Sequence, residues 1–128
     1  MYYVMIETHF SAAHALRGYN GKCENLHGHN WNVEVYLKGE ELDETGMLID
    51  FKDLKSAARK VMQYLDHQNL SDLKPFDAEM NPSSECIARF ILARINEIID
   101  AKMAIVFKVR VWETPSTCAT YELDSLHP

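Results

Sequence analysis

Two segments with a helical apolar repeat lie between two pairs of strand-like segments, and this order restricts the possible folds more than any other feature of the chain. The strand-like segments are residues 3–10, 31–37, 105–112 and roughly 117–123. Between the pairs, apolar stripes of helical period follow Asp50 and Ser83, two residues that can cap the start of a helix. The pattern predicts an α+β fold, in which an antiparallel four-stranded sheet in ββααββ order is covered on one face by two helices.

Length and charge limit the class of protein. With 128 residues, of which 47% are hydrophobic, the chain is expected to form a single domain over residues 1–128. The net charge of −6 argues against nucleic acid as a partner, because binding to phosphates needs clustered Lys and Arg. Three cysteines give no paired disulfide framework, and no apolar run reaches membrane-spanning length. We therefore expect a cytoplasmic protein with no membrane partner.

The segment around His27 and His29 carries the strongest chemical signal. In an extended segment, side chains two residues apart leave the same face about 7 Å apart, so these two imidazoles can converge on one ion. His14 follows a strand-like run, and a neighbouring strand can bring it to the pair. Three imidazoles without an obvious fourth protein ligand are typical of an open, catalytic zinc site, although the thiolate of Cys23 is also a possible fourth ligand. The alternative is that the His-x-His pattern occurs by chance.

Other polar residues are less specific. Asp66 and His67 adjoin at the end of the first predicted helix, where a carboxylate can hold and polarise an imidazole in a proton relay, or where both can simply be solvated. Glu85 lies in the first turn of the second helix, where the helix dipole alone favours a carboxylate. Glu113 is in phase with the apolar residues Val109 and Val111, and an inward carboxylate is costly unless it has a partner.

Six short motifs, read together, resemble one family. They are Phe10-Ser11-Ala12-Ala13-His14, Cys23-x3-His27-Gly28-His29, Gly46-Met47-Leu48-Ile49-Asp50-Phe51, Leu65-Asp66-His67, Asn81-Pro82-Ser83-Ser84-Glu85 and Glu113-Thr114-Pro115. In this order they resemble the 6-pyruvoyltetrahydropterin synthase and 6-carboxytetrahydropterin synthase family over nearly the whole chain. The resemblance implies the tunnelling fold, in which trimers pair into homohexamers and active sites lie between subunits. It also implies a small-molecule substrate, 7,8-dihydroneopterin triphosphate.

The resemblance assigns a role to each of the site residues. It implies a Zn²⁺ ion on His14, His27 and His29, with Cys23 as an unligated base. Asp66 and His67 of an adjacent subunit would complete a proton relay. Glu113 would accept hydrogen bonds from the pterin ring, in a pocket lined by Ser83, Ser84 and Glu85.

The spacing between Cys23 and His27 bears on the product. Family members that make the carboxy product, a precursor of queuosine, resemble this chain in having three residues there, whereas pyruvoyl-forming members typically have five. Glu24 resembles the glutamate of a subgroup that cleaves the side chain to 6-hydroxymethyl-dihydropterin for folate, which raises the possibility of two activities, although Glu24 can also be a solvated loop charge. The alternatives are a 6-pyruvoyltetrahydropterin synthase and a non-catalytic zinc-binding module.

Overall fold

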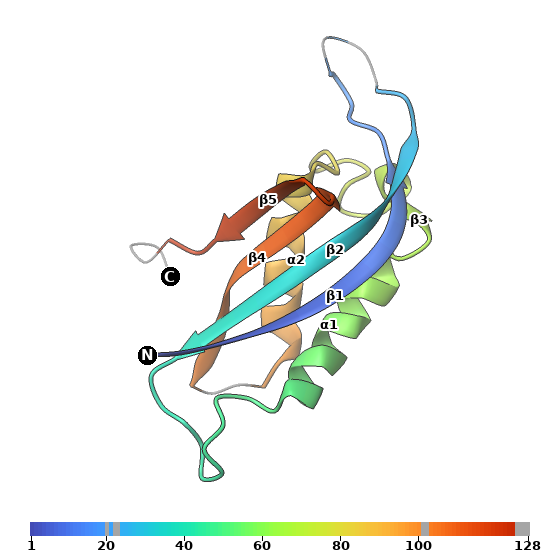
Figure 1. Cartoon of the computed structure of the whole chain (residues 1–128). Helices are drawn as coiled ribbons and strands as arrows, with labels where there is room; N and C mark the ends of the chain where they lie inside the picture. The colour runs from blue at the N-terminus through green and yellow to red at the C-terminus, as the bar shows by residue number, and fades with distance from the viewer. Residues whose placement is uncertain (20, 22–23, 101–102, 125–128) are drawn as a thin grey trace.

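One five-stranded sheet organises the chain, and the computed structural model describes residues 1–19, 21, 24–100 and 103–124 (Figure 1). The strands are β1 (Tyr2–His14), β2 (His27–Gly39), β3 (Gln68–Asn69), β4 (Ala104–Thr114) and β5 (Thr117–Glu122). Their order in the sheet is β3-β1-β2-β4-β5, and all neighbours are antiparallel except β3, which runs parallel to β1.

The prediction of a four-stranded sheet in ββααββ order is therefore wrong in one element. Strand β3 lies between the two long helices in sequence and contains only two residues, which pair with Ala12 and Ala13 of β1. A strand this short cannot show an alternation of apolar and polar side chains, so periodicity does not detect it. It is formed by tertiary contacts at the edge of the sheet.

Two helices cover one face of the sheet, as predicted (Figure 1). Helix α1 spans Phe51–Leu65 and helix α2 spans Ser84–Ile98, with the short 3-10 helix η1 (Leu70–Asp72) between them. The predicted caps are confirmed, because the Asp50 carboxylate accepts the backbone N–H of Lys52 and the Ser83 hydroxyl accepts that of Cys86. Among the described residues, none of the helices has the length and apolarity needed to cross a membrane.

The core between the sheet and the helices reaches the end of the sheet that carries the histidines. Trp31 is fully buried, stacks on Phe10 and donates its indole N–H to the carbonyl oxygen of Ala12. Its ring also lies against the imidazoles of His14 and His29, with ring centroids 4.9 and 5.1 Å apart. Burial of one such aromatic side chain contributes about 1.5–3 kcal/mol. Because Trp31 is packed in the core, its ring gives the imidazoles of His14 and His29 a fixed surface to pack against.

Candidate metal centre and active site

Strand pairing brings the three predicted histidines together. His14 is directly opposite His27 in the β1–β2 ladder, and His29 is opposite Ala12. Side chains that are directly opposite in an antiparallel pair point to the same face, so all three imidazoles meet at the end of the sheet. The ring centroids are 4.6 Å apart for His14 and His27, 4.8 Å for His27 and His29, and 5.2 Å for His14 and His29.

Glu113 joins this cluster from the end of β4. Its Oε1 atom lies 3.1 Å from Nε2 of His14 and 3.2 Å from Nε2 of His29. One candidate ligand atom from each of the four residues lies within 4.8 Å of the others. The sequence predicted an inward Glu113 from its phase with Val109 and Val111, but that pattern did not place it beside the imidazoles. The structure therefore adds a carboxylate to the three predicted ligands.

Two backbone carbonyl groups determine which imidazole nitrogens face the centre. Nδ1 of His14 lies 2.7 Å from the carbonyl oxygen of Pro82, and Nδ1 of His27 lies 2.8 Å from that of Asn25. A carbonyl oxygen only accepts, so both Nδ1 atoms donate, and in the neutral ring form that a metal ion requires each Nε2 directs a lone pair into the cluster. These two Nε2 atoms are 3.1 Å apart.

The cluster is thus a convergence of hydrogen-bond acceptors. Nε2 of His29 is buried and has no hydrogen-bond partner, although it lies near the Glu113 carboxylate. Burial lowers the pKa of His29 against the opposing effect of Glu113, and the neighbouring His14 and His27 lower it further. Neutral imidazoles and a carboxylate aimed at one point are satisfied by a cation, and three imidazole nitrogens with a nearby carboxylate suit a metal ion such as zinc.

Comparison with known proteins shows the family of the chain. The family model for 6-pyruvoyl tetrahydropterin synthase matches residues 3–124. The chain belongs to this family. It is 34% identical to 6-carboxy-5,6,7,8-tetrahydropterin synthase of Haemophilus influenzae, over 95% of this chain and 99% of that protein.

Solved structures of the family have the same fold. The Caenorhabditis elegans 6-pyruvoyl tetrahydropterin synthase superposes with a TM-score of 0.79 at 32% identity, covering 97% of this chain and 98% of that one. A Plasmodium vivax 6-pyruvoyltetrahydropterin synthase, in which a catalytic glutamate is replaced by alanine, gives 0.79 at 26% identity, with 96% and 98% covered. The family's relatives are pterin synthases, so this chain has the fold of an enzyme family.

Of the two predicted bases, only Glu24 lies among the described residues, shortly before β2. Cys23 lies outside the described residues. The Glu24 carboxylate is 3.4 Å from the backbone nitrogen of Leu16, which donates to it, and 3.9 Å from Nδ1 of His27. Nδ1 is on the opposite side of the His27 ring from the Nε2 atom that faces the cluster. Glu24 therefore lies at the rim of the candidate metal centre and not among its ligands.

Asp66 and His67 form the predicted pair where α1 ends. Oδ2 of Asp66 is 2.7 Å from Nδ1 of His67, and Oδ1 accepts the backbone N–H of Ser11. These two contacts, that from Ser11 first, lower the pKa of Asp66. The His67 side chain is 82% exposed, and within the described part of the chain no hydrogen bond or ion pair joins the pair to the imidazole cluster. His67 does line one open hollow with His29, of about 520 Å³.

The predicted substrate-binding residues are found at the start of α2. Ser84, Glu85 and Glu113 line one pocket of about 200 Å³, whereas the Ser83 hydroxyl is used as the cap of α2. No ion pair or hydrogen bond of the Glu85 carboxylate is found among the described residues, so this carboxylate remains available to a ligand. The pocket adjoins the candidate metal centre because Glu113 belongs to both.

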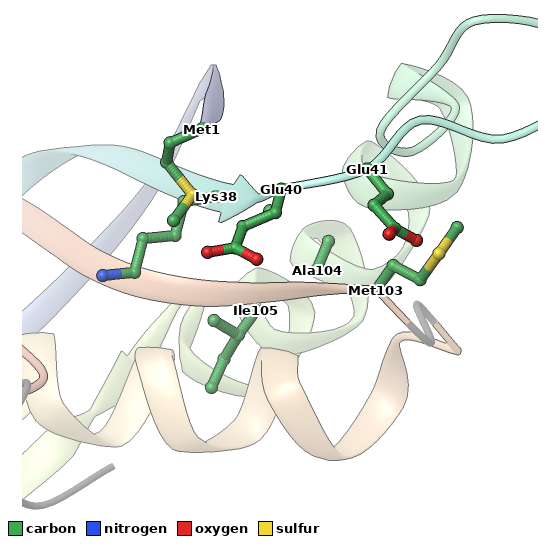
Figure 2. A pocket seen from close by; sticks show the side chains of 8 residues that line it. Met1, Lys38, Glu40, Glu41, Met103, Ala104 and Ile105 are labelled. Atoms are coloured by element: carbon green, nitrogen blue, oxygen red, sulfur yellow. The ribbon is translucent and has the colours of Figure 1, made fainter.

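A second hollow, of about 470 Å³, lies at the opposite end of the strands (Figure 2). It is formed where β2 ends and β4 begins, and Lys38, Glu40 and Glu41 surround it with the sulfur-bearing side chains of Met1 and Met103. None of the predicted site residues lines it. The pocket beside the imidazoles therefore remains the candidate active site.

Proposed function

We propose that this chain is a zinc-dependent lyase that acts on 7,8-dihydroneopterin triphosphate and forms 6-carboxytetrahydropterin. The observation that carries the proposal is the convergence of three imidazoles and one carboxylate beside a pocket with a second carboxylate. The similarity to a protein named 6-carboxy-5,6,7,8-tetrahydropterin synthase supports this product, as does the three-residue spacing between Cys23 and His27.

His14, His27 and His29 would hold the zinc ion. When bound, zinc would polarise and acidify the hydroxyl groups of the substrate side chain. The Nδ1 hydrogen bonds of His14 and His27 keep the rings oriented, and the lowered pKa of His29 keeps that ring neutral near pH 7. Glu113 would compensate the positive charge at the centre through its contacts with His14 and His29.

Proton transfer is assigned to the chain's own side chains. Cys23, as a thiolate, would remove a proton from the substrate side chain. The hydrogen bond from Nδ1 of His67 to Asp66 orients that imidazole so that its exposed Nε2 atom can accept or donate a proton. Because this pair has no contact with the cluster among the described residues, it would serve the site of an adjacent subunit.

The sheet edges support such an assembly. Among the described residues, the outer edge of β1 pairs only at Ala12 and Ala13, and β5 is the other edge of the sheet. Exposed strand edges favour pairing with another chain unless something covers them. Pairing of these edges would give the tunnelling fold and the homohexamer, a dimer of trimers, with active sites between subunits.

The pterin ring would be held by a carboxylate. A ring N–H and an amino group form a donor pair that a single carboxylate accepts in a bidentate manner. Glu113 and Glu85 both line the pocket, and Glu85 is not engaged by the imidazoles. We assign Glu113 to the ring as the motif predicts, because its carboxylate oxygens have enough lone pairs to accept from the ring while Oε1 stays beside His14 and His29.

A second activity is supported by Glu24. Its carboxylate lies at the rim of the cluster, 3.9 Å from Nδ1 of His27, and adjoins Cys23 in sequence. A base at this place would release 6-hydroxymethyl-dihydropterin from the same substrate. The Plasmodium vivax relative, which has a catalytic glutamate, provides a precedent for a carboxylate in catalysis within this fold.

One assay tests the proposal. The purified protein, loaded with zinc, is incubated with 7,8-dihydroneopterin triphosphate, and the products are separated and identified. Release of 6-carboxytetrahydropterin is the expected result, with 6-hydroxymethyl-dihydropterin beside it if Glu24 acts as a second base. The pyruvoyl product alone would assign the other activity of the family, and no turnover with bound zinc would leave a non-catalytic zinc-binding module.

A further inference from the structure

One candidate metal ligand depends on an irregular segment of the chain for its orientation. His14 is 2% exposed, and its Nδ1 atom donates to the carbonyl oxygen of Pro82 at 2.7 Å. Pro82 lies before the start of α2, outside any helix or strand, so no backbone ladder fixes that carbonyl group. Something else must hold the segment in register with β1.

The neighbouring residue, Asn81, supplies that connection. Its Oδ1 atom accepts the backbone N–H of Arg17 at 2.9 Å, and its Nδ2 atom donates to the carbonyl oxygen of Arg17, also at 2.9 Å. The Arg17 guanidinium group donates in turn to the carbonyl oxygen of Met80 at 2.9 Å. The three hydrogen bonds join residues 80 and 81 to the residue three positions after His14.

We propose that Asn81 is a positioning residue for the candidate metal centre, acting on His14 through the Pro82 carbonyl group. The Asn81 amide pairs with both backbone groups of Arg17, accepting from its N–H and donating to its carbonyl oxygen, as a neighbouring strand would. These two hydrogen bonds hold the segment that contains Pro82 beside the end of β1. With the carbonyl group held, the His14 ring keeps its proton on Nδ1 and its lone pair on Nε2. The inference rests on the proposed metal centre.

The fold contains a matched control for a purely structural role. Asn96 makes the same pair of bonds, with Nδ2 donating to the carbonyl oxygen of Val106 and Oδ1 accepting its N–H, both at 2.9 Å. It connects α2 to β4, and it has no contact with the imidazole cluster among the described residues. Replacing either asparagine by alanine removes two hydrogen bonds of similar geometry, but only Asn81 adjoins the carbonyl group that holds His14.

The first experiment measures zinc affinity by competition with a chromogenic chelator in wild type, Asn81→Ala and Asn96→Ala. Loss of an outer partner of a ligating histidine lowers metal affinity about 10-fold or more, so we expect that loss for Asn81→Ala and none for Asn96→Ala. Equal affinities for the two variants would overturn the inference. If Asn81→Ala does not fold, Asn81→Asp, which keeps the acceptor for the Arg17 N–H, is compared with Asn96→Ala by the same criterion.

The second experiment needs no metal and so separates this inference from the proposed function. Nitrogen chemical shifts of the His14 ring in the metal-free protein, at a fixed pH of about 8, report which nitrogen carries the proton. We expect the Nδ1–H form in wild type and Asn96→Ala, and a mixture of both forms in Asn81→Ala. An unchanged His14 tautomer in Asn81→Ala would refute the inference, whereas a wild type that binds no zinc but shows the tautomer change would refute only the metal centre.

Discussion

Glu113→Gln is the change that tests most directly whether the cluster binds a cation. The substitution keeps the size of the side chain and removes one negative charge from a position 3.1 and 3.2 Å from two imidazole nitrogens. At an effective dielectric constant of about 20, opposite unit charges 4 Å apart attract by about 4 kcal/mol. The Glu113 side chain is 32% exposed, and we reduce this figure by half for solvent screening. A loss of about 2 kcal/mol corresponds to zinc binding that is about 30-fold weaker.

The assay is a titration of the metal-free protein with zinc against a competing chelator. Glu85→Gln is the matched control, because Glu85 lines the same pocket without any contact to the imidazoles in the described part of the chain, and its zinc affinity should equal that of wild type. A zinc affinity of Glu113→Gln within twofold of wild type would refute the electrostatic reasoning. Weaker binding of a pterin ligand by that variant, with zinc binding unchanged, would show that Glu113 serves the ring alone.

Three further outcomes are expected. His27→Ala and His29→Ala should each lose most of the bound zinc in metal analysis, and full retention in both would remove the imidazoles from the centre. Cys23→Ala should keep zinc but lose the carboxy product, whereas Glu24→Ala should lose only 6-hydroxymethyl-dihydropterin, so loss of zinc from Cys23→Ala would identify the thiol as a ligand. The pKa of His29 is lowered from 6.5 by burial, so the unfolded chain binds more protons, and the denaturation midpoint of the metal-free protein should fall as the pH drops below about 6.5. A midpoint that is constant between pH 7.5 and 5.5 would contradict that last expectation.

The regular parts of the fold could be predicted because their residues satisfy local rules. Asp50 and Ser83 cap α1 and α2 as their side chains suggest, and Val33 and Val35 are buried as the alternation in β2 requires. The first two predicted strands, residues 3–10 and 31–37, are shorter than the observed β1 and β2. Strand β1 continues to His14 and strand β2 already begins at His27, because the two strands remain paired through small and polar residues that carry no apolar signal.

The candidate site was predictable in its ligands but not in its contacts. His27 and His29 are close in sequence, so their spacing alone indicates a common face. The position of Glu113 beside them depends on the register of β4 against β2, which pairs residues about 80 positions apart, and on an irregularity between Trp112 and Thr114 in the pairing of β4 with β5. The carbonyl group of Pro82 could not be identified as a partner of His14, because backbone carbonyl groups leave no mark in a sequence.

The geometry of the cluster also indicates how metal binding is coupled to folding. Beside the rings of His14 and His27, Nε2 of His29 is buried without a hydrogen-bond partner, and an unsatisfied buried acceptor opposes folding. The fully buried Trp31 and the β1–β2 ladder hold these rings in place, so the core, and not the metal, orders the site. A zinc-finger domain is unfolded without its metal, whereas this chain should remain folded and gain stability. At a free zinc concentration 100 times the dissociation constant the gain is about 2.7 kcal/mol, which for 128 residues raises the melting temperature by about 10 °C. Calorimetry of the metal-free protein that shows no cooperative transition would instead mean that the metal is required for the fold.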